Sequence, residues 1–309
     1  MKFDFGEILT RAWQITWKHK KLWVYAMLPF VIWALYLPLF MLVFPWGVIE
    51  NPTSSSPILD FLERPGSETI LVVGLLGTTA LAFLLQLFGN AALTLGVVRA
   101  ESGQETQGLI DLFKASLLYV GRILGAMLLI GLAVFIGLVA FTACSAAVSM
   151  VTFGIGSIFL QFLLYPIMFA VAIVSEQSQA GIVADDLGVT DALSRAWDLL
   201  TSHIWKFLLI GVVIYIVRSV LASFITVPMV IPMWFVMFNS LASEAAPPDM
   251  SMLWLSMLCM VAALPFYVVF MGITTTYTRA AFVVTYRRLT RDSEARQEFL
   301  KAMQAQEEK

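Results

Sequence analysis

The chain has 309 residues, of which 60% are hydrophobic and 13% are charged, and its formal net charge is −2. A soluble globular domain carries about 25% charged residues. The composition therefore argues against an ordinary soluble domain and favours a protein that lies in a lipid bilayer. The basic residues form short clusters at predicted helix ends and no broad basic face, which argues against a nucleic-acid partner.

Long stretches without charge predict membrane-spanning helices. A span needs about 20 apolar residues, because about 30 Å of hydrocarbon is crossed at about 1.5 Å per residue. Backbone groups in lipid must bond within their own segment, which favours helices over open strands. We therefore expect an all-α membrane protein with about six transmembrane helices. The predicted spans are residues 22–45, 69–97, 119–141, 151–174, 205–227 and 251–278.

The distribution of lysine and arginine predicts the orientation of these spans. Of the 19 basic residues, all except Arg64 and Arg218 lie in the N-terminal segment, the connections after the second and fourth spans, or the C-terminal tail. Basic residues stay on the cytoplasmic side of a membrane. Both termini are therefore expected in the cytoplasm.

Three segments on the cytoplasmic side share one pattern of apolar residues, and each precedes an odd-numbered span. They are residues 5–17, 109–120 and 189–201, with apolar positions at i, i+3, i+4, i+7 and i+8. This spacing is typical of one face of an amphipathic helix. The first and third also share a motif, GEILTRAW at 6–13 and TDALSRAW at 190–197.

The shared pattern predicts an internal repeat within one membrane domain. Each repeat unit is an interfacial helix followed by a helical hairpin, over residues 1–103, 104–186 and 187–309. Asp4 and Thr190 are the expected N-caps of the first and third interfacial helices. The alternative is that unrelated amphipathic helices share a stripe by chance, and three copies in one register favour duplication.

Tryptophans lie within and just after the first and third interfacial helices. Indole rings are enriched at membrane–water interfaces. We expect the following residues to act as interfacial anchors: Trp13, Trp17, Trp23, Trp197 and Trp205.

Arg218 is the candidate functional residue inside a span. Ionisable residues at membrane depth are costly and are candidate functional sites. No carboxylate lies in a predicted span. The candidate partners are the amides Gln86 and Asn90, which share a helix face, Gln161, the backbone carbonyls freed by Pro228 and Pro232, or a lipid phosphate. One interpretation is a lipid or anion contact made by Arg218, Gln86 and Asn90. The alternatives are an Arg218 side chain that reaches the headgroups, and amides that join helices.

Two further features leave alternatives open. Pro228 and Pro232 interrupt the fifth apolar stretch, and residues 228–238 form either a short surface helix or a broken helix of the transporter kind. Cys144 and Cys259 are either structural thiols or one disulfide. The sequence has no catalytic constellation, metal-ligand cluster or cofactor motif, so we expect no catalytic, metal or cofactor site.

TDALSRAW at 190–197, followed by WKFLL at 205–209, and AFVVTYRRL at 281–289 resemble a known membrane domain. It occurs in glycerophosphoryl diester phosphodiesterases and in related uncharacterised multipass families of bacteria and archaea. The resemblance is best over 186–292 and implies an architecture. In those phosphodiesterases the chemistry belongs to a separate soluble α/β-barrel domain, which this sequence does not contain. The resemblance therefore implies a protein that is not an enzyme.

Three functions compete on these observations. The first is a non-enzymatic scaffold or accessory subunit in the cytoplasmic membrane of a prokaryote, which binds phospholipid or another membrane protein. The second is a transporter or flippase-like protein with a site near Arg218. The third is an intramembrane lipid enzyme, which needs a cluster of His, Asp or Glu at membrane depth.

Overall fold

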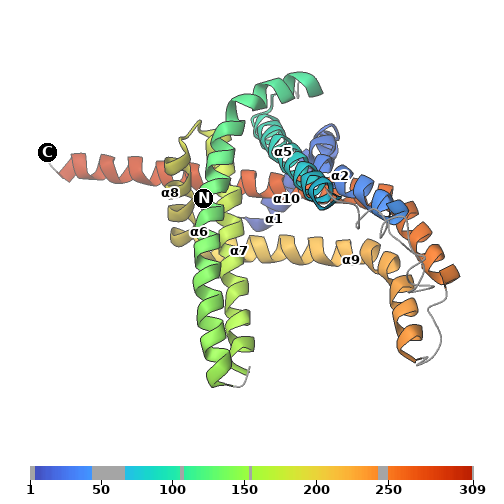
Figure 1. The fold of residues 1–309 in the computed structure, drawn as a ribbon. Coiled ribbons are helices and arrows are strands. Elements are labelled where there is room, and N and C mark those ends of the chain that lie inside the picture. Colours follow the sequence, from blue (N-terminus) through green and yellow to red (C-terminus); the bar gives the residue numbers. More distant parts are fainter. Residues whose placement is uncertain (1–3, 44–66, 105–107, 153–154, 243–249, 308–309) are drawn as a thin grey trace. The chain divides into compact units, whose positions relative to one another are not determined.

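The computed structural model describes residues 4–43, 67–104, 108–152, 155–242 and 250–307, and these residues form helices joined by short turns, with no strand among them. This confirms the all-α fold class. The helices of Figure 1 are α1 (Phe5–Lys18), α2 (Leu22–Val43), α5 (Ser67–Glu101), α6 (Leu109–Val151), α7 (Ile155–Ala184), α8 (Val189–Ser202), α9 (Ile204–Ala242) and α10 (Met250–Glu307).

Five helices are long and apolar enough to cross a membrane. Within the described side chains, α2 contributes the shorter apolar stretch Leu22–Ile32. The count of six spans therefore stays a prediction, and the end of the predicted span 22–45 lies outside the described residues. The five candidate spans are Val72–Glu101, Leu109–Val151, Phe159–Ala184, Ile204–Phe224 and Leu258–Arg291.

Several helices run further than the sequence predicts. α6 joins the predicted interfacial segment 109–120 to the following span without a break, and α10 continues through the tail to Glu307. α9 is helical through Pro228 and Pro232, so residues 228–238 are not a separate helix, although Figure 1 shows α9 bending in its later part. Proline removes one backbone donor, and a membrane helix tolerates this loss where neighbouring groups compensate.

The chain divides into two compact units, which we describe separately. Unit 1 holds both terminal segments and the middle of the chain. Unit 2 holds two long intervening segments. Unit 1 comprises Met1–Leu22, Asn90–Ile214 and Thr276–Lys309, and unit 2 comprises Trp23–Gly89 and Tyr215–Thr275. These boundaries cut across the three predicted repeat units, so the repeat organisation stays a prediction.

In unit 1, α1 and α8 have the same length and bury the same aligned positions. Each is a 14-residue helix, and α6 buries the two aligned positions of its first turns, Leu112 and Ser116. The matching buried residues are Ile8, Ala12 and Ile15 of α1, and Ala192, Ala196 and Leu199 of α8. Trp13, Trp17 and Trp197, on the opposite faces, are exposed.

α1 and α8 also end alike. The backbone N–H of His19 donates to the Ile15 carbonyl at 3.0 Å, and that of His203 donates to the Leu199 carbonyl at 3.1 Å. The position of α6 that aligns with the two histidines is Ile123, which is fully buried in the helix. α6 continues through this position as one helix, whereas α1 and α8 end there.

The two predicted N-caps have different outcomes. The Asp4 carboxylate accepts the Gly6 and Glu7 backbone N–H groups at 2.8 and 3.3 Å, which confirms Asp4 as the N-cap of α1. The prediction of Thr190 is wrong, because α8 begins earlier and its N-cap is Gly188. Gly188 has no side chain to cap with, and Asp191 supplies the acidic residue of the first turn.

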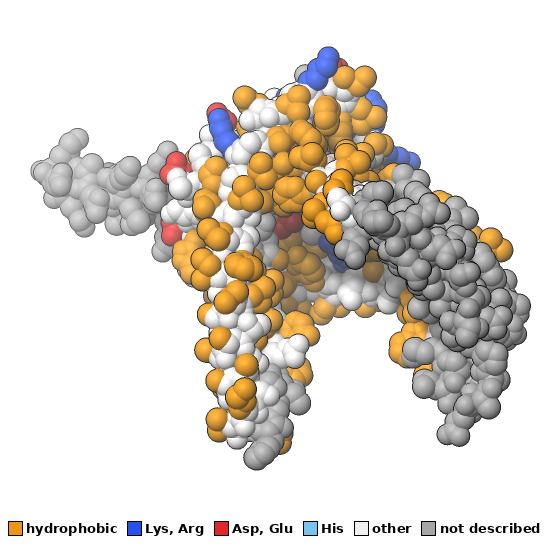
Figure 2. Space-filling view, in the orientation of Figure 1, with side chains coloured by type: hydrophobic (Ala, Val, Ile, Leu, Met, Phe, Trp, Pro, Cys, Tyr) orange, Lys and Arg blue, Asp and Glu red, His pale blue; other side chains and the backbone are white. Residues whose placement is uncertain are grey.

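The α6–α7 hairpin exposes apolar side chains along most of its length. Figure 2 shows hydrophobic side chains down the visible face of the hairpin and charged ones toward its upper end. Phe135, Ile136 and Phe162 are each at least 60% exposed. A soluble monomer rarely exposes so continuous an apolar surface, whereas lipid covers it without cost.

Unit 2 brings α2 close to α5 and α10. Phe30 and Tyr267 make an edge-to-face contact with ring centroids 6.5 Å apart. A Cβ at Gly89 would lie 2.7 Å from the Tyr25 carbonyl oxygen, and one at Gly272 would lie 3.2 Å from the Trp23 carbonyl oxygen. Glycine at these positions allows the backbones to approach closely, as at other membrane helix interfaces.

We predict that Gly89→Ala lowers the melting temperature of the protein in detergent. The new methyl group meets a backbone oxygen, so a helix must shift. Gly77→Ala on the same helix is the control, because a Cβ there has nothing within 4 Å. Alanine alone favours a helix by up to about 1 kcal/mol. The control should melt at the parent temperature or above it, and an unchanged melt for Gly89→Ala would contradict the close approach.

Candidate functional site

Unit 1 contains a buried polar cluster where α7 meets α10. Arg279 is 5% exposed; it donates from Nη1 to Gln179 Oε1 at 2.9 Å, and the same nitrogen lies 2.9 Å from Glu176 Oε2. The contact with Glu176 is an ion pair by distance, but it lacks hydrogen-bond geometry. One step away, Gln177 Nε2 donates to the Phe282 carbonyl at 3.4 Å.

This cluster satisfies a charge that cannot be removed by titration. A guanidinium keeps its proton in proteins, so a buried arginine needs acceptors. Glu176 supplies the opposite charge and Gln179 supplies a neutral acceptor, both from α7. Breaking such a pair leaves a buried charge uncompensated. The cluster therefore holds α7 and α10 in one relative position.

A second contact joins α10 to the segment after α7. The Tyr286 hydroxyl, on a fully buried ring, donates to Asp185 Oδ2 at 2.7 Å. Arg195 of α8 approaches the same carboxylate oxygen at 3.6 Å. A Cβ at Gly181 would lie 2.9 Å from the Tyr286 hydroxyl, so this glycine makes room for the ring. Asp185 thus links α8 and α10.

Ion pairs fix α1 to the ends of two other helices. Arg11 Nε donates to Glu101 Oε2 of α5 at 2.9 Å, and Arg288 of α10 donates to Glu7 at 2.6 Å. The hydrogen bond from Arg288 lowers the pKa of the Glu7 carboxyl group. On α6, Arg122 pairs with Asp186, whose φ of 54° lies in the left-handed region that aspartate tolerates.

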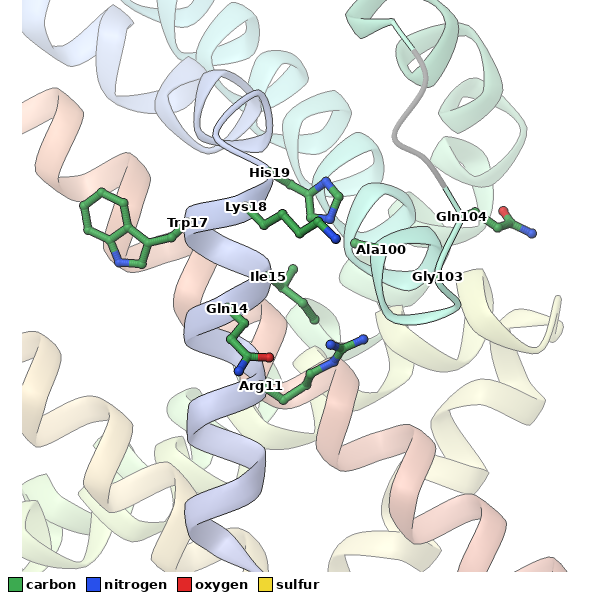
Figure 3. A pocket seen from close by; sticks show the side chains of 9 residues that line it. All are labelled: Arg11, Gln14, Ile15, Trp17, Lys18, His19, Ala100, Gly103 and Gln104. Carbon is green, nitrogen blue, oxygen red and sulfur yellow. The ribbon is translucent and has the colours of Figure 1, made fainter.

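A groove of about 650 Å³ lies between α1 and the C-terminal end of α5 (Figure 3). Arg11, Ile15, Lys18 and His19 project from α1 toward the end of α5, whereas Trp17 projects to the other side of α1. The lining residues are Arg11, Gln14, Ile15, Trp17, Lys18, His19, Ala100, Gly103 and Gln104.

The potential in this groove is positive. Partial burial lowers the pKa of His19, and the charges of Lys18 and Arg11 lower it further. The Glu101 carboxylate pairs with Arg11. The lowered pKa favours the neutral form of His19 near pH 7.

The site predicted around Arg218 is not assembled by a described contact. Arg218 is half-buried on α9 and Gln86 is exposed on α5, and among the described residues of unit 2 no hydrogen bond or ion pair joins them. Asn90 belongs to unit 1 and is half-buried, and its carbonyl accepts the Thr94 hydroxyl at 2.8 Å. The lipid or anion contact of these residues stays a prediction.

The predicted anchors have the exposure that an interface requires. Their depth in a membrane stays a prediction. Trp13, Trp17, Trp197 and Trp205 are exposed and Trp23 is half-buried. Trp13 and Trp17 also touch edge to face, with centroids 5.4 Å apart, and Lys20 Nζ lies 5.9 Å from the Trp17 ring centroid.

Sequence reasoning missed the polar cluster of α7 and α10. A signal was present, because the polar run SEQSQ at 175–179 directly follows a predicted span and Arg279 directly follows another. Both runs lie at the predicted cytoplasmic ends of spans, where polar residues are ordinary. Nothing in the sequence pairs position 176 with position 279.

Within the described residues there is no group of three or more His, Cys, Asp or Glu side chains that could hold a metal ion, and Cys144 and Cys259 are both free thiols. No family model, no curated protein and no solved structure matches this chain. The fold therefore defines the class of the protein, which is a helical protein with several helices suited to a membrane. The comparisons do not assign it to a family.

We predict that Arg279→Met destabilises the protein by about 3–5 kcal/mol, the usual cost of leaving one partner of a buried ion pair alone. The control is Arg122→Met, which removes an exposed pair and should cost about 1 kcal/mol or less. Chemical or thermal unfolding in detergent measures both. The double variant Glu176→Met, Arg279→Met should recover part of the loss, and equal losses for Arg279→Met and Arg122→Met would contradict the buried pair.

Proposed function

We propose that this chain is a non-enzymatic integral membrane protein that acts as a scaffold or accessory subunit and binds lipid or a membrane protein partner. It lies in the cytoplasmic membrane of a prokaryote, with six spans and both termini in the cytoplasm. The observation that carries the proposal is the charged end of unit 1, where ion pairs fix the short helix α1 beside the ends of α5 and α10.

The contacts of the polar residues between α7, α8 and α10 support a structural use. Glu176, Gln179 and Arg279 are engaged with one another, and Asp185 is engaged with Tyr286 and Arg195. Groups that hold helices together in this way are not available to transfer protons to a substrate. What unit 1 presents outward is apolar helix surface and a fixed set of basic and aromatic side chains, which suit lipids and membrane partners.

We also propose that the chain is a threefold repeat of an interfacial helix and a helical hairpin. The equal length of α1 and α8, their shared buried positions and their histidine ends support duplication. The start of α6 buries the aligned positions Leu112 and Ser116, although this copy is continuous with its span. The resemblance to the phosphodiesterase membrane domain agrees with this architecture.

We expect topology reporters to place both ends of the chain in the cytoplasm. A reporter that is active only in the cytoplasm should work when fused after Lys309 or near Gln104, because most basic residues lie on that side. It should fail when fused near Ser55 or Ala246. The opposite pattern would show that the orientation is wrong, and equal activity near Gln104 and Ser55 would show that residues 69–97 do not cross the membrane.

A transporter or flippase-like protein is the second candidate, and Arg218 supports it. The residue is half-buried within the candidate span Ile204–Phe224, where a permanent charge needs an acceptor. A lipid phosphate or an anionic substrate is such an acceptor. The two candidates differ in whether this arginine is needed for binding.

Native mass spectrometry of the protein taken from its own membrane tests both candidates. We expect the parent to retain phospholipid or a protein partner, and Arg218→Leu to retain as much with an unchanged melting temperature. Arg291→Leu, which removes an exposed arginine from α10, is the control. Loss of bound lipid in Arg218→Leu alone would favour the second candidate. A parent protein that retains neither lipid nor a protein partner would contradict the scaffold proposal.

A further inference from the structure

The groove between α1 and α5 is lined by a cation, Lys18, that makes no ion pair with the described part of the chain. Arg11 is held by Glu101, whereas Lys18 is exposed and lines the groove with its ammonium group toward α5. Among the described residues no carboxylate lies within ion-pair distance of Lys18. An ammonium group beside an open cavity of about 650 Å³ is placed to meet a ligand.

An interaction with the carbonyl groups at the nearby helix ends does not explain why a lysine lies here. Carbonyl groups at helix C-termini attract lysine. Here the Ile15 and His19 carbonyls of α1 already accept backbone N–H groups, from His19 and Leu22 at 3.0 and 2.9 Å. The Arg99 and Ala100 carbonyls of α5 accept backbone N–H groups in the same way. These four carbonyls therefore already have backbone donors.

The aligned helices show that a lysine is not required to build this structure. The position of Lys18 corresponds to Ser202 at the end of α8, and α8 forms the same 14-residue helix with the same histidine end. In α6 the corresponding residue is Arg122, which is paired with Asp186. Arg11 corresponds to Arg195, and both pair with a carboxylate. The arginine pairs are shared by α1 and α8, and at the position aligned with Lys18 the cation without a described ion pair is the one on α1.

We propose that this groove binds the phosphate group of an anionic phospholipid, with Lys18 and Arg11 as the phosphate contacts. The inference rests on the proposed function and names the ligand and the place. Lysine binds phosphate as a point charge, and the terminal nitrogens of Arg11 offer a planar pair of donors beside it. Partial burial lowers the pKa of His19, and the charges of Lys18 and Arg11 lower it further; these two cations favour an anion at this position.

The surroundings favour a lipid over a free phosphate ion. The groove lies at the end of a candidate span, Val72–Glu101, and therefore at headgroup depth. Exposed Trp13 and Trp17 stand on the same helix as Lys18, and Lys20 covers the Trp17 ring. Indole rings and basic side chains together are typical of the interface of a leaflet with anionic lipids.

The chain provides its own reporter for the test. It has two histidines, His19 in the groove and His203 at the aligned position of α8, so selective histidine labelling yields two NMR signals. A bound anion raises the pKa of a neighbouring imidazole. In nanodiscs of phosphatidylglycerol, compared with phosphatidylcholine, the His19 pKa should rise while the His203 pKa stays constant.

Three variants make the assignment specific, with phosphatidylglycerol binding followed by native mass spectrometry. Lys18→Gln should weaken binding about fivefold, the usual effect of one basic residue at an anionic surface. Lys114→Gln, an exposed lysine on α6, is the matched control for general surface charge and should have a smaller effect. Glu101→Gln removes the carboxylate beside Arg11 and should strengthen binding. A residue with only a structural role would not produce opposite effects from Lys18→Gln and Glu101→Gln.

Each other outcome overturns the proposal. Equal losses from Lys18→Gln and Lys114→Gln would show surface attraction without a groove, and no gain from Glu101→Gln in a protein that melts normally would show that Arg11 takes no part. A His19 shift with millimolar inorganic phosphate in phosphatidylcholine would assign the groove to a soluble anion. If the parent retains lipid that none of these variants affects, the proposed lipid site in the groove is wrong while the scaffold proposal stands. If the parent retains neither lipid nor partner, both proposals are wrong.

Discussion

The fixed charge of Arg279 is the constraint on which the packing of unit 1 depends. Within an apolar environment an arginine cannot be neutralised, so the residues around it must supply acceptors. Glu176 and Gln179 do so from one face of α7, which determines how α7 and α10 meet. Tyr286, about two turns further along α10, then reaches Asp185, and Asp185 in turn meets Arg195 of α8. One buried charge therefore sets the positions of three helices.

A charged side chain near apolar surroundings needs a partner, and this need also explains why arginine–carboxylate pairs hold the charged end of unit 1 together. Apolar contacts between helices give little orientation in lipid, because lipid tails are as apolar as leucine. Polar pairs supply direction. Arg11 with Glu101 and Arg288 with Glu7 fix α1 to α5 and α10, although α1 is short and its buried face is narrow. A helix of this length without such pairs would be marginal in water and free to rotate on a membrane surface.

The sequence predicts the helices better than their ends or their partners. Charge-free stretches locate the apolar helices because the cost of burying a charge in lipid is large and local. The predicted helix boundaries were wrong where the pattern was ambiguous, as in α6, where Ile123 replaces a polar end residue, and at Thr190, where Gly188 caps α8 instead. The contact of Glu176 with Arg279 could not be predicted, because residues so far apart in the chain show no local periodicity and each is ordinary at a helix end.

The comparison of α1 with α8 separates the residues that the fold requires from those that are free to bind a ligand. Both helices keep the buried face, the histidine end and the arginine that meets a carboxylate, so these features belong to the fold. Two of their exposed positions differ in charge, Gln14 against Asp198 and Lys18 against Ser202. The Ser202 hydroxyl donates to the Asp198 carbonyl at 2.6 Å, whereas Lys18 lines an open groove. If α1 and α8 are copies of one element, as we propose, Lys18 is the position at which we expect α1 to bind a ligand that α8 does not.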